Sequence, residues 1–115
     1  MSIETKYLFV AAMDVEPAAE ALFNEVYDSE HVPELSKVPG VRKVTRLKGE
    51  PFRFSIGGAI KEMPAPSPVY IALYEIDSPA VLTSPAWAAA SEKGRWAAEV
   101  RPHTKNRSHA VYKVR

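Results

Sequence analysis

The chain has 115 residues, of which 46% are hydrophobic and 25% charged, with 15 basic and 14 acidic side chains and a net charge of +1. This length predicts a single domain over residues 1–115, and the near balance of charge argues against nucleic acid or a lipid surface as a partner, since both need a concentrated basic field. The absence of cysteine excludes disulfides and thiol chemistry, and no apolar stretch reaches the ~20 residues that cross a bilayer, so we expect a cytoplasmic protein.

The first part of the chain predicts a strand, a helix and a second strand. Residues 7–13 are continuously apolar, which is typical of a central strand that is buried on both faces. From Pro17 onward, apolar side chains recur at helical spacing. We expect this helix to kink or stop near His31, because Pro33 cannot continue it without the loss of a backbone hydrogen bond. A turn at Pro39-Gly40 then leads into an alternating strand at residues 41–48.

Residues 49–68 interrupt this regular pattern with glycines and prolines. We interpret them as a long loop or insertion, with room for one short strand at residues 52–56. Loops of ~20 residues inside a compact domain are usually functional or mobile. We therefore expect this segment either to cover the mouth of a cleft as a lid or to reach across to a partner subunit.

The last part of the chain repeats the order strand, helix, strand. Residues 69–76 alternate clearly, helical pieces follow at 79–83 and 85–93, and residues 107–114 predict a closing strand. The complete order is β-α-β-β-α-β, so the predicted fold class is α+β and ferredoxin-like, with a four-stranded antiparallel sheet and two helices on one face. Because the first and third strands are apolar on both sides, the open sheet face needs a cover. The simplest cover is a second copy of the chain, so the pattern predicts a homodimer.

Several segments resemble one family. The run from Phe23 through Glu30-His31-Val32-Pro33, the following Pro39-Gly40 and Arg46 resemble the EthD-like branch of the dimeric α/β-barrel superfamily. Residues 70–75, 84–87 and 101–103 are similar to its third strand, its second helix and the lead-in to its last strand. The resemblance covers nearly the whole chain except residues 49–68 and implies a dimeric α/β barrel. Members include cofactor-free monooxygenases, polyketide cyclases, lactone isomerases, dehydratases and heme-binding enzymes, so the fold alone does not select an activity.

His31 is the first candidate for chemistry. At a helix C-terminus the helix dipole would favour its imidazolium, and a pKa near neutrality would suit proton abstraction. The alternative is that His31 caps its own helix. Tyr27, one turn earlier, is a candidate hydrogen-bond donor to a substrate oxygen, although an aromatic residue at this spacing is commonly core. Glu30, which precedes His31, is a weaker candidate for orienting it.

Arg46 and His103 complete the predicted site. Arg46 on the second strand is a candidate for binding a carboxylate or enolate, or else a solvated edge charge. His103 and His109 lie six residues apart at the last strand, and we rank His103 higher because it is placed at the strand entry. No metal-ligand spacing is present, so we expect no metal site. Aromatic side chains predicted to line a ligand pocket are Tyr70, Tyr74, Trp87, Trp96 and Tyr112.

These features predict a small cofactor-independent enzyme that acts on an aromatic or polyketide-like carbonyl compound. His31 would transfer the proton in a reaction of isomerase, cyclase, lyase or monooxygenase type. The alternative is a non-catalytic dimeric binding or accessory protein for a hydrophobic small metabolite. Structural self-association alone would explain the dimer but not a histidine that faces a cleft.

Overall fold

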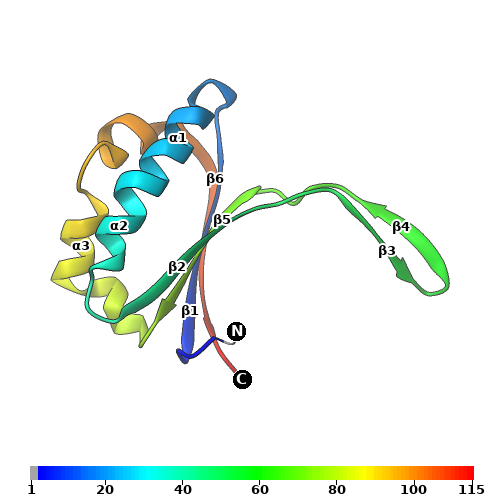
Figure 1. Ribbon diagram of the computed structural model, residues 1–115. Helices are drawn as coiled ribbons and strands as arrows, with labels where there is room; N and C mark the ends of the chain where they lie inside the picture. The colour runs from blue at the N-terminus through cyan, green and yellow to red at the C-terminus, as the bar shows by residue number, and fades with distance from the viewer. Residues whose placement is uncertain (1–2) are drawn as a thin grey trace.

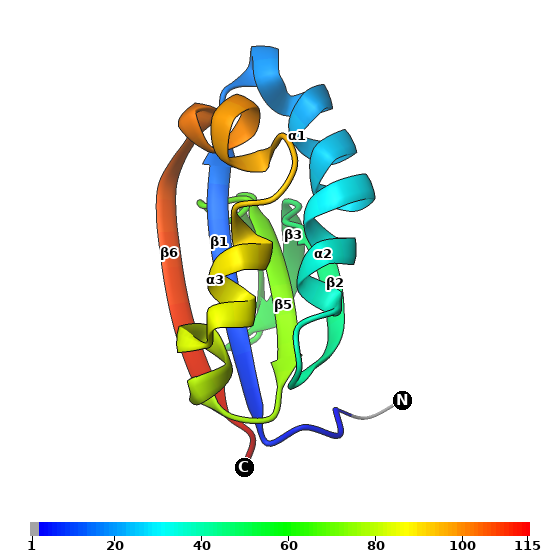
Figure 2. The same ribbon diagram turned by 90° about the vertical axis from the view of Figure 1, so that its left-hand side faces the viewer.

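The predicted sheet is present in the computed structural model, which describes residues 3–115. Its strands are β1 (Tyr7–Val15), β2 (Val41–Lys48), β5 (Tyr70–Ile76) and β6 (Thr104–Lys113), in the antiparallel order β2-β5-β1-β6. β1 therefore lies between two neighbours, which explains its continuous apolar run. The α+β, ferredoxin-like fold class predicted from the sequence is confirmed, with all helices on one face of the sheet (Figures 1 and 2).

The helical layer consists of two groups of short segments. The first contains η1 (Pro17–Ala19), α1 (Glu20–Val26), η2 (Tyr27–His31) and α2 (Val32–Ser36). The second contains η3 (Pro79–Thr83), α3 (Pro85–Ser91), η4 (Trp96–Val100) and η5 (Arg101–His103). Ser84 begins α3 as expected of a helix cap, since its hydroxyl accepts the N–H of Trp87 at 3.1 Å. No helix within residues 3–115 is long and apolar enough to cross a membrane.

Of the two outcomes expected near His31, a kink or a stop, the stop is wrong. The helix passes through a π-helical turn at Tyr27–His31 and continues into α2 as far as Ser36. Pro33 stands in the first turn of α2, where its missing N–H and fixed φ are tolerated. The wider π turn therefore accommodates the proline that the sequence pattern interprets as a helix stop.

The two faces of the sheet differ in burial. Along β5 the side chains that face the helices, Tyr70, Ala72, Tyr74 and Ile76, are buried, whereas the alternate residues are only half-buried. The half-buried set includes Ile71 and Leu73, and Leu8 and Val10 of β1 share their face of the sheet. The sheet thus packs its core against the helices and leaves an apolar face uncovered.

The region predicted as a long loop is instead largely a β-hairpin. β3 (Phe52–Ile56) and β4 (Ala59–Met63) pair only with each other, as a separate two-stranded sheet. Gly57 and Gly58 connect them with positive φ angles of 59° and 81°, which a two-residue hairpin turn requires. The short strand expected at 52–56 is confirmed. The hairpin projects from the side of the sheet opposite the helices (Figure 1).

Candidate functional site

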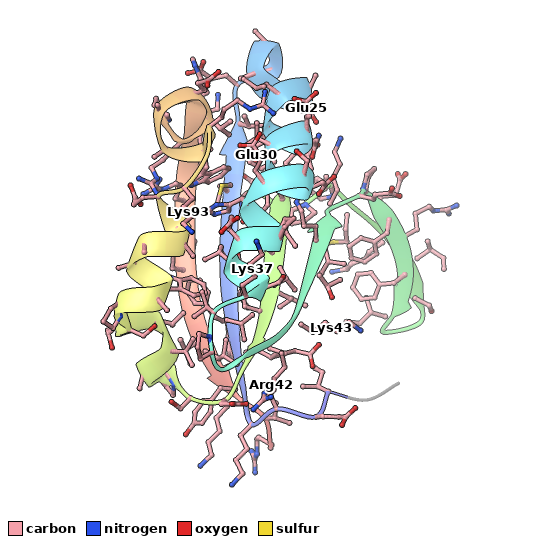
Figure 3. All side chains as sticks on the ribbon, turned by 60° about the vertical axis from the view of Figure 1, so that its left-hand side comes forward. Glu25, Glu30, Lys37, Arg42, Lys43 and Lys93 are labelled. Carbon is pink, nitrogen blue, oxygen red and sulfur yellow. The ribbon has the colours of Figure 1, made fainter. Side chains whose placement is uncertain are left out.

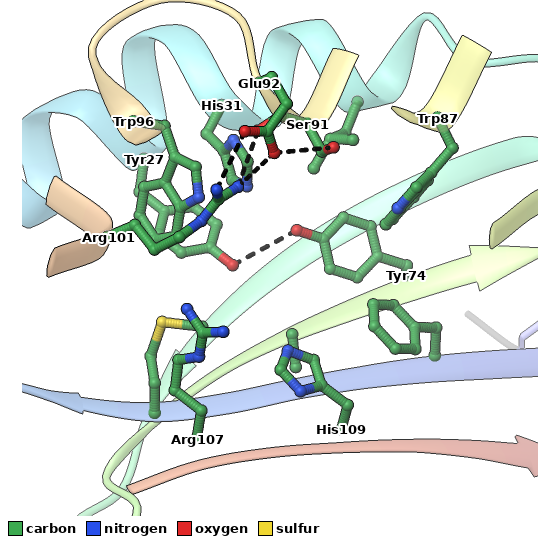
Figure 4. A pocket seen from close by; sticks show the side chains of 14 residues that line it. Tyr27, His31, Tyr74, Trp87, Ser91, Glu92, Trp96, Arg101, Arg107 and His109 are labelled. Atoms are coloured by element: carbon green, nitrogen blue, oxygen red, sulfur yellow. Dashed lines mark hydrogen bonds and ion pairs between the residues drawn. The ribbon is translucent and has the colours of Figure 1, made fainter. Parts of the chain in front are cut away.

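A cavity of about 350 Å³ lies between the helical layer and the sheet (Figure 4). This volume falls in the lower part of the ~300–1,000 Å³ range of small-molecule pockets. Aromatic rings and aliphatic side chains share its wall with a comparable area of polar and charged groups. The lining residues are Phe9, Ala11, Met13, Tyr27, His31, Leu35, Tyr74, Trp87, Ser91, Glu92, Trp96, Arg101, Arg107 and His109.

His31 is the buried polar group of this cavity. Its side chain is 6% exposed, and its ring stacks on Trp96 with the centroids 4.3 Å apart and meets Tyr27 edge-on at 5.1 Å. Its Nδ1 atom is buried and has no hydrogen-bond partner within residues 3–115. Buried polar atoms are nearly always paired with protein, water or a ligand. Because the surrounding side chains close off Nδ1, a molecule in the cavity would meet the ring at its other nitrogen, Nε2.

The protonation state of His31 differs from the expectation. Burial, followed by the nearby positive charge of Arg101, lowers the pKa of His31 from 6.5 to about 4, while Glu92 opposes this shift. The ring lies inside a continuous helix and not at its C-terminus, so the free carbonyls that would favour an imidazolium are absent. The expected pKa near neutrality is therefore wrong, and His31 is neutral at pH 7.

Two π-helical turns bring cavity residues together. Tyr27 and His31 lie in η2, and Trp96 begins η4, so both turns contribute rings to the same contact. Glu30 does not orient His31, because its carboxylate accepts the backbone N–H of Arg95 at 2.9 Å and pairs with the guanidinium of the same residue. Figure 3 shows Glu30 on the helix that carries η2. π turns recur at functional sites, where the extra residue redirects side chains.

Two tyrosine hydroxyls meet inside the cavity. The Tyr27 and Tyr74 oxygens are 3.3 Å apart, and burial raises the pKa of both hydroxyls. One O–H serves this hydrogen bond, and the hydrogen of the other has no acceptor among residues 3–115. The pair can therefore donate one hydrogen bond to an oxygen in the cavity. Tyr27 is both core, as its 2% exposure shows, and part of the cavity wall.

The opposite wall comes from β6. Arg107 and His109 project from this strand toward the helices (Figure 4). The His109 ring stacks on Phe9 at 5.8 Å, and partial burial and then Arg107 lower its pKa. Arg107 forms no ion pair within residues 3–115, whereas Arg101 on the helical side pairs with Glu92 at 2.6 Å. The cavity thus presents one unneutralised guanidinium, which suits an anionic group.

Two of the predicted site residues lie outside the cavity. The Arg46 guanidinium packs over the rings of Phe23, Tyr27 and Tyr70 at 4.4–5.4 Å and pairs with Asp28 at 2.9 Å, with 15% of its side chain exposed. It braces the aromatic core behind Tyr27 and is not a solvated edge charge. His103 is exposed, and its Nδ1 lies 3.0 Å from the Glu16 carboxylate.

Of the aromatic residues predicted to line a pocket, Tyr74, Trp87 and Trp96 do so. Tyr70 is buried beside Phe23, and Tyr112 is 59% exposed. No group of three or more His, Asp or Glu side chains within residues 3–115 is arranged to hold a metal ion.

Sequence reasoning ranked His103 above His109 and did not consider Arg107 as a site residue. The ranking rested on the placement of His103 at the strand entry. In the structure β6 begins at Thr104, Asn106 has a positive φ of 55°, and the pairing with β1 shifts between Ala12 and Asp14. His109 pairs with Ala11, a cavity residue, and this register is the signal that would have identified it.

No protein-family model matches the sequence, and no curated protein matches it. Solved structures do match. A variant of MhuD with two manganese protoporphyrin IX molecules per active site has a TM-score of 0.59 at 14% identity, over 94% of this chain and 93% of that one. The heme-degrader MhuD from Mycobacterium tuberculosis, with two hemes bound in its active site, has a TM-score of 0.57 at 14% identity, over 94% of both chains.

An ethyl tert-butyl ether (EthD) family protein from Bacillus halodurans c-125 has a TM-score of 0.57 at 15% identity, over 95% of this chain and 99% of that one. The chain therefore shares its overall fold with these solved structures. The EthD-like resemblance predicted from the sequence is thereby confirmed at the level of fold. At these sequence identities the structural similarity shows the fold and does not indicate an activity.

Proposed function

We propose that the cavity binds a small aromatic or polyketide-like carbonyl compound that carries an anionic oxygen, and that His31 assists proton transfer on it. The observation that carries this proposal is the largely buried His31 ring, which lines an aromatic-walled cavity and forms no side-chain hydrogen bond that would occupy it within residues 3–115. A neutral imidazole has one donor and one acceptor nitrogen, so a ligand hydroxyl, or a carbon acid held beside it, would complete its hydrogen bonding.

The other polar groups support the same ligand class. The free O–H of the Tyr27–Tyr74 pair would donate to a carbonyl oxygen, and the Arg107 guanidinium would attract a carboxylate, phenolate or enolate. Negative charge that develops on the ligand during proton removal would then lie near a cation and a hydrogen-bond donor. The flat rings of Phe9 and Trp87 would contact an aromatic body.

The low pKa of His31 determines when proton transfer is feasible. With a pKa of about 4 the free imidazole is a weak base. An anionic ligand within ~4–6 Å favours the charged form of a histidine and raises its pKa. In this proposal, the ligand's own charge makes His31 basic enough to take the proton, so catalysis depends on an anionic substrate.

The second candidate is a dimeric binding or accessory protein that holds such a metabolite without converting it. The same low pKa favours it, because a neutral buried histidine suits a fixed hydrogen bond as well as proton transfer. The two candidates share the cavity and differ only in turnover.

A ligand screen with a turnover measurement tests both candidates. The panel contains aromatic carboxylates, phenols and 1,3-diketones, with hemin added because two of the similar structures hold porphyrins. Thermal shift identifies binders and mass spectrometry detects conversion, in the wild type, His31→Gln and the surface control His103→Gln. We expect conversion that His31→Gln abolishes and His103→Gln retains. Binding without conversion supports the accessory role, and full turnover by His31→Gln would refute the role of His31.

The proposed working form is a homodimer in which the open sheet faces of two copies cover each other. Support comes from the uncovered apolar side chains of β1 and β5, among them Val10, Ile71 and Leu73. An apolar sheet face of this kind is normally covered. In an isologous contact, the same face of each copy covers the equivalent face of the other. Analytical ultracentrifugation at micromolar concentration tests this, and a monomer would contradict it.

A further inference from the structure

The hairpin formed by residues 52–63, here called the arm, has one apolar face. Its large apolar side chains are unusually open to solvent, with Phe52 53%, Phe54 38%, Ile56 50% and Met63 39% exposed. Phe52 pairs with Met63 across the hairpin, and Phe54 lies two residues along β3 at 5.7 Å between the ring centroids, so these side chains share one face. The opposite face carries the polar pair Arg53 and Glu62 together with Ser55 and Ile60.

The root of the arm is fixed to the sheet. Gly49 N donates to Val69 O at 2.7 Å, and the Asp14 carboxylate accepts Val69 N at 2.8 Å and the Ser67 hydroxyl at 3.1 Å. Gly49 itself packs directly against the ring of Pro66, with no room for a Cβ atom. The arm is therefore aimed in one direction by its root, although every side chain in both of its strands is exposed.

An isolated two-stranded hairpin is marginally stable in water, and a contiguous exposed apolar patch marks an interaction surface. The arm does not serve as a lid for its own cavity, because none of residues 52–63 lines it. It also stands on the side of the sheet opposite the helices, where it overhangs the uncovered sheet face (Figure 1). The lid expected from the sequence is therefore wrong for the cavity of the same subunit.

We infer that the arm clasps a second copy of this chain. The inference depends on the sheet-face dimer proposed above: a copy seated on the open face would occupy the space beneath the arm. Sheets that pack face to face lie ~10 Å apart, so the partner's body would lie within reach of the Phe52–Phe54 face. Two-fold symmetry would make each subunit both give and receive an arm, so the apolar faces of both arms would be covered at once.

Matched variants on the two faces of the arm test the inference. The double variant Phe52→Ser/Phe54→Ser removes the apolar face, and Ile60→Ser removes an equally exposed apolar side chain, 58% exposed, from the other face. Sedimentation velocity over a concentration series gives the dimer Kd. We expect the double variant to raise it at least about tenfold and Ile60→Ser to leave it unchanged. Because β3 and β4 form a sheet separate from the main sheet, the circular dichroism of both monomers should match the wild type.

Hydrogen exchange of the wild type provides a readout without any variant. We expect the amides of residues 52–63 to become protected together with those of β1 and β5 as the dimer forms. A dimer in which the sheet is protected but the arm exchanges freely would overturn the inference while leaving the sheet-face dimer intact. An unchanged Kd in the double variant would do the same. A wild type that stays monomeric would overturn both the arm contact and the sheet-face dimer. Ligand binding in the cavity is measured separately, by thermal shift.

Discussion

Acidification should destabilise the fold through His31. In the folded protein burial holds the pKa of His31 at about 4, whereas the ordinary value of 6.5 applies to the unfolded chain. The unfolded chain therefore binds more protons at pH values between these two. The stabilising effect of the neutral ring is fully present above pH 6.5 and is lost as the pH falls toward 4.

The size of this effect follows from the difference between the two pKa values. One pKa unit corresponds to ~1.36 kcal/mol, so the free energy of unfolding should fall by about 2 kcal/mol between pH 7 and pH 5 on account of His31 alone. Carboxylates whose pKa is lowered in the folded state, such as Glu30 and Asp77, act in the same direction but only below ~4.5, where the unfolded carboxyls begin to bind protons. Between pH 7 and pH 5 the contributing groups are therefore histidines with a lowered pKa, namely His31 and also His109, whose contribution is common to the wild type and the His31 variant.

Urea unfolding at pH 7 and pH 5 measures this loss in the wild type, His31→Gln and His103→Gln. Glutamine keeps a hydrogen-bonding side chain at position 31 without a titrating group. We expect His31→Gln to be less stable than the wild type at pH 7 yet to lose about 2 kcal/mol less than the wild type between pH 7 and pH 5, and His103→Gln to lose as much as the wild type. An equal loss in the wild type and His31→Gln would refute the reasoning.

Three further substitutions separate packing from binding. Arg46→Met should cost about 1–2 kcal/mol in urea unfolding, because it removes the guanidinium from the aromatic rings beneath it, and should leave ligand affinity nearly unchanged. Tyr74→Phe should cost about 1 kcal/mol in urea unfolding, since it leaves the buried Tyr27 hydroxyl without its partner, and should retain carbonyl ligands, because the Tyr27 O–H is then free to donate. Arg107→Gln should lower the affinity for an aromatic carboxylate about tenfold without a change in melting temperature. Loss of affinity in Arg46→Met with none in Arg107→Gln would reverse the assignment of these two arginines.

Local patterns sufficed for most of the fold. The continuous apolar run of β1 and the strict alternation of β5 reflect their central places in the sheet, and Ser84 followed by Pro85 marked a helix start that the structure retains. The hairpin was underestimated because its glycines and prolines were counted as breaks. Gly57-Gly58 between alternating segments is in fact a hairpin signal.

The candidate site was only half predictable. His31 and Tyr27 are neighbours along one helix, so their spacing places them together. Arg107 and His109 reach the same cavity only through the register of β6 against β1, which is a non-local property. The pKa of His31 could not be predicted for a related reason. It is lowered mainly by burial, and the Trp96 ring that stacks on His31 lies far from it in the sequence.

The most direct test of the account is the 15N chemical shift of the His31 imidazole, measured before and after addition of a ligand found in the screen. We predict that the ring nitrogen resonances shift as the ligand hydrogen-bonds to the imidazole, and that an anionic ligand raises the pKa of His31 from about 4. Saturating binding of an anionic aromatic ligand that leaves the His31 resonances and their titration unchanged would contradict the assignment of this cavity as the functional site.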